Sequence, residues 1–151
     1  MDLKPSLPLS NIDLSTRAAE GIRRVLLMNA PTGLYMRDDR CQAPVEGMTA
    51  QPNRTPLDLA YMAACLEQKG FVCRIRDFAA EQTTWKEVEQ EYQDFHPDLI
   101  AISVTTPTLE RDLKACTLAK KILQNVWTVA KGSHFTPKDE EVLRKHTDLD
   151  L

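Results

Sequence analysis

The 151-residue chain has few glycines and no grouped cysteines, and these two shortages exclude several common kinds of site. Only five residues are glycine, and the segment NAPTGLYM after the first predicted strand contains Gly33 alone. A dinucleotide fingerprint or a P-loop needs several glycines at fixed spacing, so neither is present. The four cysteines lie far apart, which argues against a structural zinc site. Cys41 lies in a predicted loop, and the others are expected to be small buried residues: Cys65, Cys73 and Cys116.

Long apolar runs and clustered basic residues are missing as well. No segment approaches the roughly 20 apolar residues that cross a bilayer. The opening residues, MDLKPSLPLSNIDL, lack the basic and apolar regions of a secretory signal. We therefore expect a cytoplasmic protein. The formal net charge is −3 and the Lys and Arg residues are scattered. This distribution disfavours a nucleic-acid surface, because neutralising phosphates requires clustered basic side chains.

The chain does contain a regular alternation of strand and helix patterns. Its apolar fraction of 42% and charged fraction of 27% are those of an ordinary globular domain. Strand patterns cover residues 23–31, 71–77, 98–103 and 126–132, and amphipathic helices follow each of them. Strands that alternate with helices predict right-handed crossovers and a parallel sheet covered on both faces. We expect an α/β, doubly wound sheet in the order 2-1-3-4, with room for a fifth strand.

Each predicted helix has apolar residues at helical spacing, which indicates the face that packs on the sheet. The three sets are Leu59, Met62, Ala63 and Leu66; Trp85, Val88, Tyr92 and Phe95; and Leu109, Leu113, Cys116, Ile122 and Leu123. Three helices are also expected to begin at a Thr-Pro pair, with threonine as the N-cap and proline at the first helical position. The pairs are Thr55-Pro56, Thr106-Pro107 and Thr136-Pro137.

The two ends of the chain differ from its centre. Residues 1–22 are polar and contain prolines, so we expect an N-terminal arm, with room for a short helix over 14–20. Residues 23–151 form the predicted domain. The last residues, HTDLDL, end where a fifth strand would start, at Leu149. We therefore expect the chain to be an N-terminal excerpt of a longer protein.

The third strand ends in a run of hydroxyls, Ser103, Thr105 and Thr106. In the expected strand order this end lies at the switch point, where ligands bind in open α/β sheets. The long segment 31–54 and the turn 131–136 reach the same edge, and loops as long as the first are usually functional or disordered. Two interpretations are open. The hydroxyls face a ligand, or they only cap the next helix and stabilise the turn.

The histidines do not form an obvious catalytic group. His134 lies at the ligand edge, where a solvated loop residue is the more ordinary role, whereas His96 and His146 are expected at the opposite edge of the sheet. No pair of nucleophile and base is apparent. The chain by itself is therefore expected to be non-catalytic.

From about Arg24 onward, the chain resembles the N-terminal cobalamin-binding domain of cobalamin-dependent radical S-adenosylmethionine enzymes. The matching pieces occur in the same order and are RVLLMNAP, RTPLDLAYMAACLEQKGFVCRIRD, PDLIAISVTTPT and KGSHFTPKDEEVL. The second is similar to the family segment P-L-G-L-x-Y-L-A-A-x-L-x-x-x-G, and the last to the family turn GG-x-H-x-T. No single motif is diagnostic, but the ordered set is fairly specific.

The resemblance implies a flavodoxin-like (Rossmann-like) domain that holds the corrin over the carboxyl edge and buries the nucleotide tail beside the sheet. Ser103 and Thr105 would bond the tail, and Gly132 would leave room for it. The long loop near Tyr35 and Met36 would lie against the corrin face. The residues implied to bind cobalamin are Tyr35, Met36, Ser103, Thr105, Thr106, Lys131, Gly132, Ser133 and His134.

The sequence departs from related cobalamin domains at two places. Domains of the methionine synthase and mutase type have Asp-x-His-x-x-Gly after the first strand, with the histidine as cobalt ligand, but NAPTGLYMRDDR contains no histidine. As in many radical relatives, cobalt would lack a histidine ligand. Lys131 stands where the family usually has the first glycine of a pair, where it would either crowd the tail or reach its phosphate.

The radical chemistry needs CxxxCxxC to hold a 4Fe-4S cluster, and this motif is absent from the chain. The resemblance therefore implies that S-adenosylmethionine and the cluster are bound by a C-terminal radical domain of the parent protein. It also implies that the parent protein is a methyltransferase, although some relatives catalyse rearrangement or cyclisation. Two alternatives remain. One is a flavodoxin-like regulatory or interaction domain that does not bind cobalamin, and the other is an independent small α/β enzyme.

Overall fold

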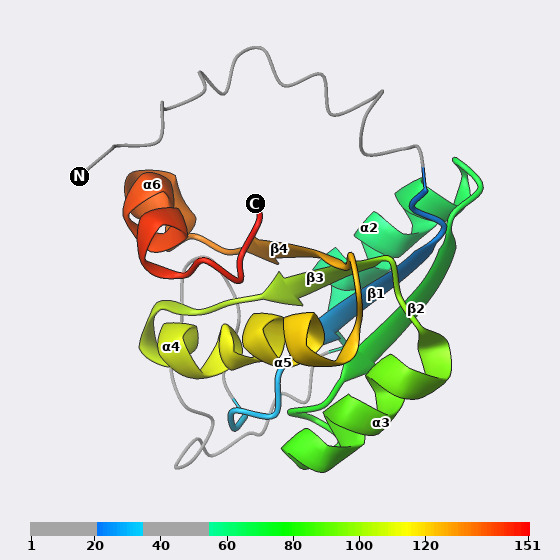
Figure 1. The fold of residues 1–151 in the computed structure, drawn as a ribbon, viewed down its shortest axis with the longest axis horizontal. Coiled ribbons are helices and arrows are strands. Elements are labelled where there is room, and N and C mark those ends of the chain that lie inside the picture. The colour runs from blue at the N-terminus through cyan, green and yellow to red at the C-terminus, as the bar shows by residue number, and fades with distance from the viewer. Residues whose placement is uncertain (1–20, 35–54) are drawn as a thin grey trace.

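Four parallel strands form one sheet in the order β2-β1-β3-β4 (Figure 1). The computed structural model describes residues 21–34 and 55–151. The strands are β1 (Arg24–Asn29), β2 (Val72–Asp77), β3 (Leu99–Ser103) and β4 (Trp127–Lys131). This order confirms the predicted doubly wound topology and places the switch point between β1 and β3.

The helices lie on both faces of the sheet, as predicted (Figure 1). They are α2 (Leu57–Glu67), α3 (Trp85–Phe95), α4 (Leu109–Asp112), α5 (Lys114–Ile122) and α6 (Phe135–Lys145). The single helix expected after β3 is divided into a 3-10 turn, η2 (Thr106–Thr108), followed by α4 and α5. None of the helices in the described ranges is long and apolar enough to cross a bilayer.

Alternating side chains of the central strands build two cores. On one face, Leu26 and Ile100 pack with residues of α3 and α5, including the buried Tyr92. On the other face, Leu27 packs with residues of α2, including the buried Leu59. Burying an aliphatic or aromatic side chain of this size contributes about 1.5–3 kcal/mol. The apolar faces predicted for the three helices are confirmed, since each contributes to one of these cores.

The predicted Thr-Pro helix starts are wrong in detail. The N-cap of α2 is Pro56, the N-cap of η2 is Thr105, and α6 begins at Phe135, before its Thr-Pro pair. The α2 start instead uses the backbone, with the Leu57 N–H donating to the Thr55 carbonyl at 2.8 Å. Proline within the first turn lacks an N–H, so the helix can begin on either side of it.

A capping box that sequence reasoning missed stabilises the start of α3. The Thr84 N–H donates to the Glu87 Oε2 atom at 2.7 Å. The signal was present as threonine followed three residues later by glutamate.

The cysteines are not all buried. Cys116 is buried in the core, Cys73 is partly exposed and Cys65 is exposed, while Cys41 lies outside the described residues. The prediction for Cys65 was wrong because this residue of α2 lies away from the helix face that contains Leu59. Burial raises the pKa of the Cys116 thiol to about 12, so this thiol stays protonated at neutral pH.

The last residues lie along the outer edge of β4. The Ala130 N–H donates to the Leu151 carbonyl at 2.8 Å, and the Leu151 N–H donates to the Thr128 carbonyl at 3.2 Å. These two bonds, to the residues on either side of Val129, are the pattern of a parallel strand pair. Asp150 adds a side-chain bond, since its Oδ2 accepts from the Thr128 N–H at 2.8 Å. The place predicted for a fifth strand is thus occupied by the chain, although the described sheet has four strands.

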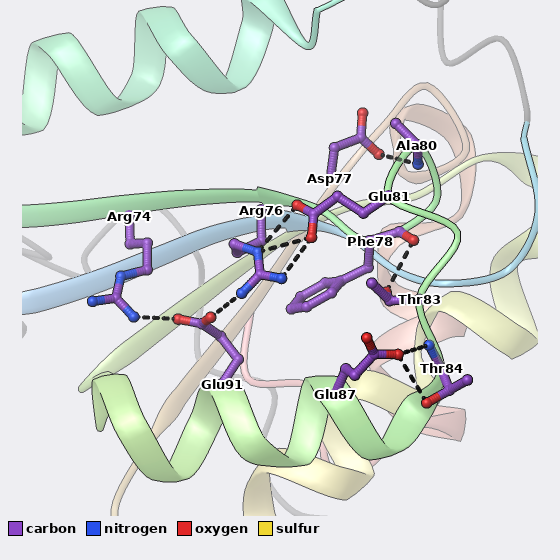
Figure 2. A network of polar contacts seen from close by, with 10 residues as sticks. All are labelled: Arg74, Arg76, Asp77, Phe78, Ala80, Glu81, Thr83, Thr84, Glu87 and Glu91. Atoms are coloured by element: carbon purple, nitrogen blue, oxygen red, sulfur yellow. Dashed lines mark hydrogen bonds and ion pairs between the residues drawn. The ribbon is translucent and has the colours of Figure 1, made fainter.

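Ion pairs join the edge strand β2 to α3 (Figure 2). Arg74 donates to Glu91 Oε1 at 2.6 Å, and Arg76 binds the other carboxylate oxygen. The Glu91 side chain is only 7% exposed, so both oxygens depend on these arginines. Each guanidinium also lies over an aromatic ring, Arg74 over Phe95 at 4.3 Å and Arg76 over Phe78 at 4.5 Å. Figure 2 shows Glu91 between the two arginines.

Candidate functional site

The four strands end in polar residues that lie in register. Asn29 of β1 is flanked by Asp77 of β2 and Ser103 of β3, and Ser103 is flanked by Lys131 of β4. Neighbours in register point to the same face of a sheet. This face is the one covered by α2, because Leu27, two residues before Asn29, packs in the α2 core. We call these four residues the edge row.

Asn29 carries a buried acceptor within the edge row. The residue is 6% exposed, and its Oδ1 atom has no hydrogen-bond partner in the structure as described. A buried polar atom without a partner costs about 1–3 kcal/mol. Such an atom is explained when a ligand or an ordered water supplies the missing donor. The edge row therefore contains one buried acceptor that a ligand or an ordered water can satisfy.

Lys131 is held across the edge row by α2. Its Nζ atom forms an ion pair with Asp58, which lies in the first turn of α2. Both side chains are partly exposed, at 32% and 44%. Exposed ion pairs are weak, about 0–1 kcal/mol, so an anionic ligand can replace Asp58 at low cost. The structure thus offers Lys131 as a cation at the end of β4.

Gly132 is required by the protein's own backbone. A Cβ atom at this position would lie 2.2 Å from the Val104 carbonyl oxygen, and the glycine has a φ of +153°. The chains approach closely here because the Val104 N–H donates to the Lys131 carbonyl at 2.8 Å. The resemblance implies that Gly132 leaves room for a nucleotide tail. The structure shows the Val104 carbonyl at the place that a side chain of residue 132 would take.

The hydroxyl run at the end of β3 is largely internal. Thr105 is 1% exposed, and its hydroxyl lies 2.6 Å from the Thr108 hydroxyl. Thr106 reaches the turn after β4, where its hydroxyl lies 3.2 Å from His134 Nδ1. Ser103 is buried within the edge row. The Thr105 side chain thus takes part in the turn after β3, and the Ser103 side chain lies in the edge row.

The structure brings several of the predicted site residues together. Ser103 and Lys131 are neighbours in register, Thr106 contacts His134, and Ser133 lies half-buried between β4 and α6. Tyr35 and Met36 lie outside the described residues. The roles of all nine residues in cofactor binding stay predictions.

Sequence reasoning missed other residues at this edge. Asn29 and Asp77 were visible as the polar ends of two strands. Asp112 was visible as an acid on the apolar helix face, three residues after Leu109 and four before Cys116, and it is fully buried.

One histidine was placed wrongly. His146 was expected at the opposite edge of the sheet, but its Nε2 atom is 3.6 Å from Glu110, which follows η2 at the carboxyl edge. The adjacent Lys145 also pairs with Glu110, so the last turn of α6 lies beside the start of α4. A helix that packs across the end of a sheet, rather than along it, keeps both of its ends near one edge. Residues 21–34 and 55–151 contain no group of three or more His, Cys, Asp or Glu that could hold a metal ion.

Comparison with known proteins identifies a family and one curated relative. Residues 47–151 match the B12 binding domain family. The chain is 32% identical over 95 residues to a protein of Pyrococcus horikoshii named "Uncharacterized methyltransferase PH0819". The alignment covers 63% of this chain and 20% of the relative, so the chain spans about a fifth of the relative's length. No solved structure matches the chain.

The family match begins after β1, and it includes β2 to β4, α2 to α6 and three of the four residues of the edge row. It also agrees with the parallel order β2-β1-β3-β4, since open α/β sheets of this kind generally bind ligands at their carboxyl edge. Because the match covers more than half of the sequence, the chain belongs to the B12 binding domain family.

Proposed function

We propose that the chain is the cobalamin-binding module of a radical S-adenosylmethionine methyltransferase and holds cobalamin at the carboxyl edge without a histidine ligand. Membership of the B12 binding domain family supports the cofactor. The methyltransferase part rests on the name of the Pyrococcus relative, of which this chain spans a fifth. The radical part rests on the resemblance, and it assigns S-adenosylmethionine and the 4Fe-4S cluster to a C-terminal domain outside this chain.

The buried Oδ1 atom of Asn29 is the observation that carries the site. Cobalamin has amide N–H groups and a ribose hydroxyl, and either would supply the donor that this atom lacks. Its tail also contains a phosphate, which suits Lys131 as a cation after exchange with Asp58. The chemistry of the edge row therefore fits the cofactor, with Asn29 as acceptor and Lys131 as counter-ion.

The chain's own residues would bind and orient the cofactor. When bound, cobalamin supplies a methyl group that can be transferred. The loop after β1, NAPTGLYMRDDR, has no histidine, so it offers cobalt no imidazole ligand. Ser103 would add a hydroxyl beside Asn29, because the two residues are in register.

One observation favours the alternative, a flavodoxin-like regulatory or interaction domain that does not bind cobalamin. Contacts within the chain already use part of the described edge. Lys131 forms an ion pair with Asp58, and the Val104 carbonyl lies in the space beside Gly132. A domain that had lost its cofactor would have such internal contacts. Measuring cofactor binding separates the two proposals.

We expect the purified chain to retain cobalamin when it is titrated anaerobically with hydroxocobalamin and then desalted. The absorbance spectrum should show the blue-shifted bands of a displaced lower base, because the loop supplies no histidine and the tail is bound away from cobalt. Retention with a spectrum unchanged from the free cofactor would contradict binding in this mode. A chain that is folded by circular dichroism but retains nothing would instead favour the interaction domain. The coding sequence after the codon for Leu151 tests the radical part, which requires CxxxCxxC there.

Replacement of Lys131 by alanine is expected to weaken hydroxocobalamin binding about tenfold, since a hydrogen bond to a charged group contributes about 1.5–3 kcal/mol. The dissociation constant should also become less sensitive to salt, because the lost contact is electrostatic. Lys121→Ala, which removes the same charge from the exposed last turn of α5, is the matched control. Tighter binding by Lys131→Ala would mean that the lysine crowds the tail.

A further inference from the structure

Asp112 joins the loops that follow β1 and β3. The residue ends α4 and its side chain is completely buried. The Thr32 hydroxyl, from the loop after β1, donates to its Oδ1 atom at 2.6 Å. The Thr108 hydroxyl, from η2 after β3, donates to its Oδ2 atom. One carboxylate therefore contacts both sides of the switch point.

The threonine hydroxyls around Asp112 form a chain with a defined direction. A hydroxyl has one proton to donate, and Thr108 donates it to Asp112 Oδ2. The Thr105 hydroxyl, 2.6 Å from the Thr108 oxygen, then donates to Thr108. A longer contact of 3.4 Å also directs the Thr105 N–H toward Asp112. These bonds fix the orientation of the turn that follows Ser103.

We propose that Asp112 is a positioning residue for the cobalamin site. It holds the loop after β1 and the turn after β3 at a fixed separation. These two segments continue from Asn29 and Ser103, so their separation sets where these two residues lie. This inference rests on the proposed function, since the site it positions is the cobalamin site. Asp112 itself does not contact the cofactor, because it has no exposed surface.

An aspartate suits this role better than an apolar residue or an amide. It presents two acceptors on a short side chain, and each receives a hydroxyl from a different loop. Alanine would leave the donors of Thr32 and Thr108 in a buried space. Asparagine would keep one acceptor, its carbonyl oxygen. Its NH2 group would donate to the second threonine hydroxyl, which can accept as well as donate. We therefore expect asparagine to restore part of what alanine loses.

The test compares Asp112→Ala and Asp112→Asn with Glu91→Ala. Glu91 is also a buried carboxylate with two partners, but these lie between β2 and α3, away from both loops. The dissociation constant for hydroxocobalamin is measured at a temperature at which circular dichroism shows every variant folded. Asp112→Ala is expected to weaken binding at least tenfold, Asp112→Asn less, and Glu91→Ala less than twofold.

A second variant covers the case in which Asp112→Ala does not fold. Thr32→Val keeps the shape of the side chain and removes only the hydroxyl that reaches Asp112 from the β1 loop. It is expected to weaken binding several-fold. In the cofactor-free variant, hydrogen exchange should accelerate at the amides of residues 32–34 and 105, which a loss of global stability would not single out.

The outcomes separate this inference from the proposed function. If the unmodified chain retains cobalamin and the Asp112 and Thr32 variants bind it equally well, the positioning role is wrong while the cofactor assignment stands. If Glu91→Ala weakens binding as much as Asp112→Ala, the effect is one of stability and the positioning role is again wrong. If the unmodified chain does not bind cobalamin, both proposals fail.

Discussion

Replacing Gly132 with alanine is expected to lower the free energy of unfolding by about 3 kcal/mol, the upper part of the range for overpacking a closely packed position. The added Cβ atom would lie 2.2 Å from the Val104 carbonyl oxygen. That oxygen belongs to backbone and cannot rotate away, so β3 and β4 would have to separate where the Val104 N–H bonds to Lys131. Chemical denaturation followed by circular dichroism measures the change.

Gly70→Ala is the matched control for the backbone conformation alone. Gly70 has a φ of +88°, but nothing lies within 4 Å of a Cβ atom added there. Its replacement is expected to cost about 1 kcal/mol, from the left-handed backbone region that alanine disfavours. If the two variants lose equal stability, the contact with Val104 is not what requires glycine at position 132.

Replacing Glu91 with alanine is expected to lower the free energy of unfolding by about 2 kcal/mol. Removing one partner of a buried ion pair costs about 3–5 kcal/mol, because the other charge is left without compensation. Here the cost is smaller, since Arg74 and Arg76 are 44% and 28% exposed and can be hydrated in part. Chemical denaturation again measures the change. The midpoint should fall, and the dependence of the unfolding free energy on denaturant concentration should stay unchanged if the variant remains two-state.

Glu81→Ala is the control for this second prediction. Glu81 also pairs with Arg76, at 2.5 Å, but its side chain is 38% exposed. A hydrogen bond from Arg76 lowers the pKa of Glu81, so this carboxylate is ionised at neutral pH. An exposed pair contributes about 0–1 kcal/mol. An equal loss of stability in both variants would mean that burial of Glu91 does not decide the effect.

The fold could be predicted because it depends on patterns that repeat along the chain. Leu59 and Ala63 lie one helical turn apart and both face the sheet, and Leu26 and Leu27 alternate between the two cores. Such periodicity survives small errors in position. The starts of the helices do not have this redundancy. Proline can precede or follow the first helical residue, so Thr55 and Thr136 were assigned as N-caps when α2 and α6 begin elsewhere.

The candidate site was predicted only in part, because its interactions join residues far apart in sequence. The end of β3 correctly indicated a polar edge, and Ser103 lies there. The contact of the Thr105 N–H with Asp112, seven residues later, could not be read from the hydroxyl run alone. Likewise, Asp58 and Lys131 are 73 residues apart, and no local pattern connects them. Contacts between residues so far apart in sequence can be identified only from the folded structure.

The arginines of β2 bear on whether the edge strands of two molecules can pair. In the described sheet β2 is an edge strand, and its outer backbone groups resemble a template on which a strand of another molecule could add. Val72 and Ile75 are 56% and 37% exposed, which would favour such addition. Arg74 and Arg76 lie on either side of Ile75 in this strand, and their bonds to Glu91 tie the strand to α3. Charged side chains on an edge strand disfavour the addition of a second strand, so we expect these arginines to limit edge-to-edge pairing between copies.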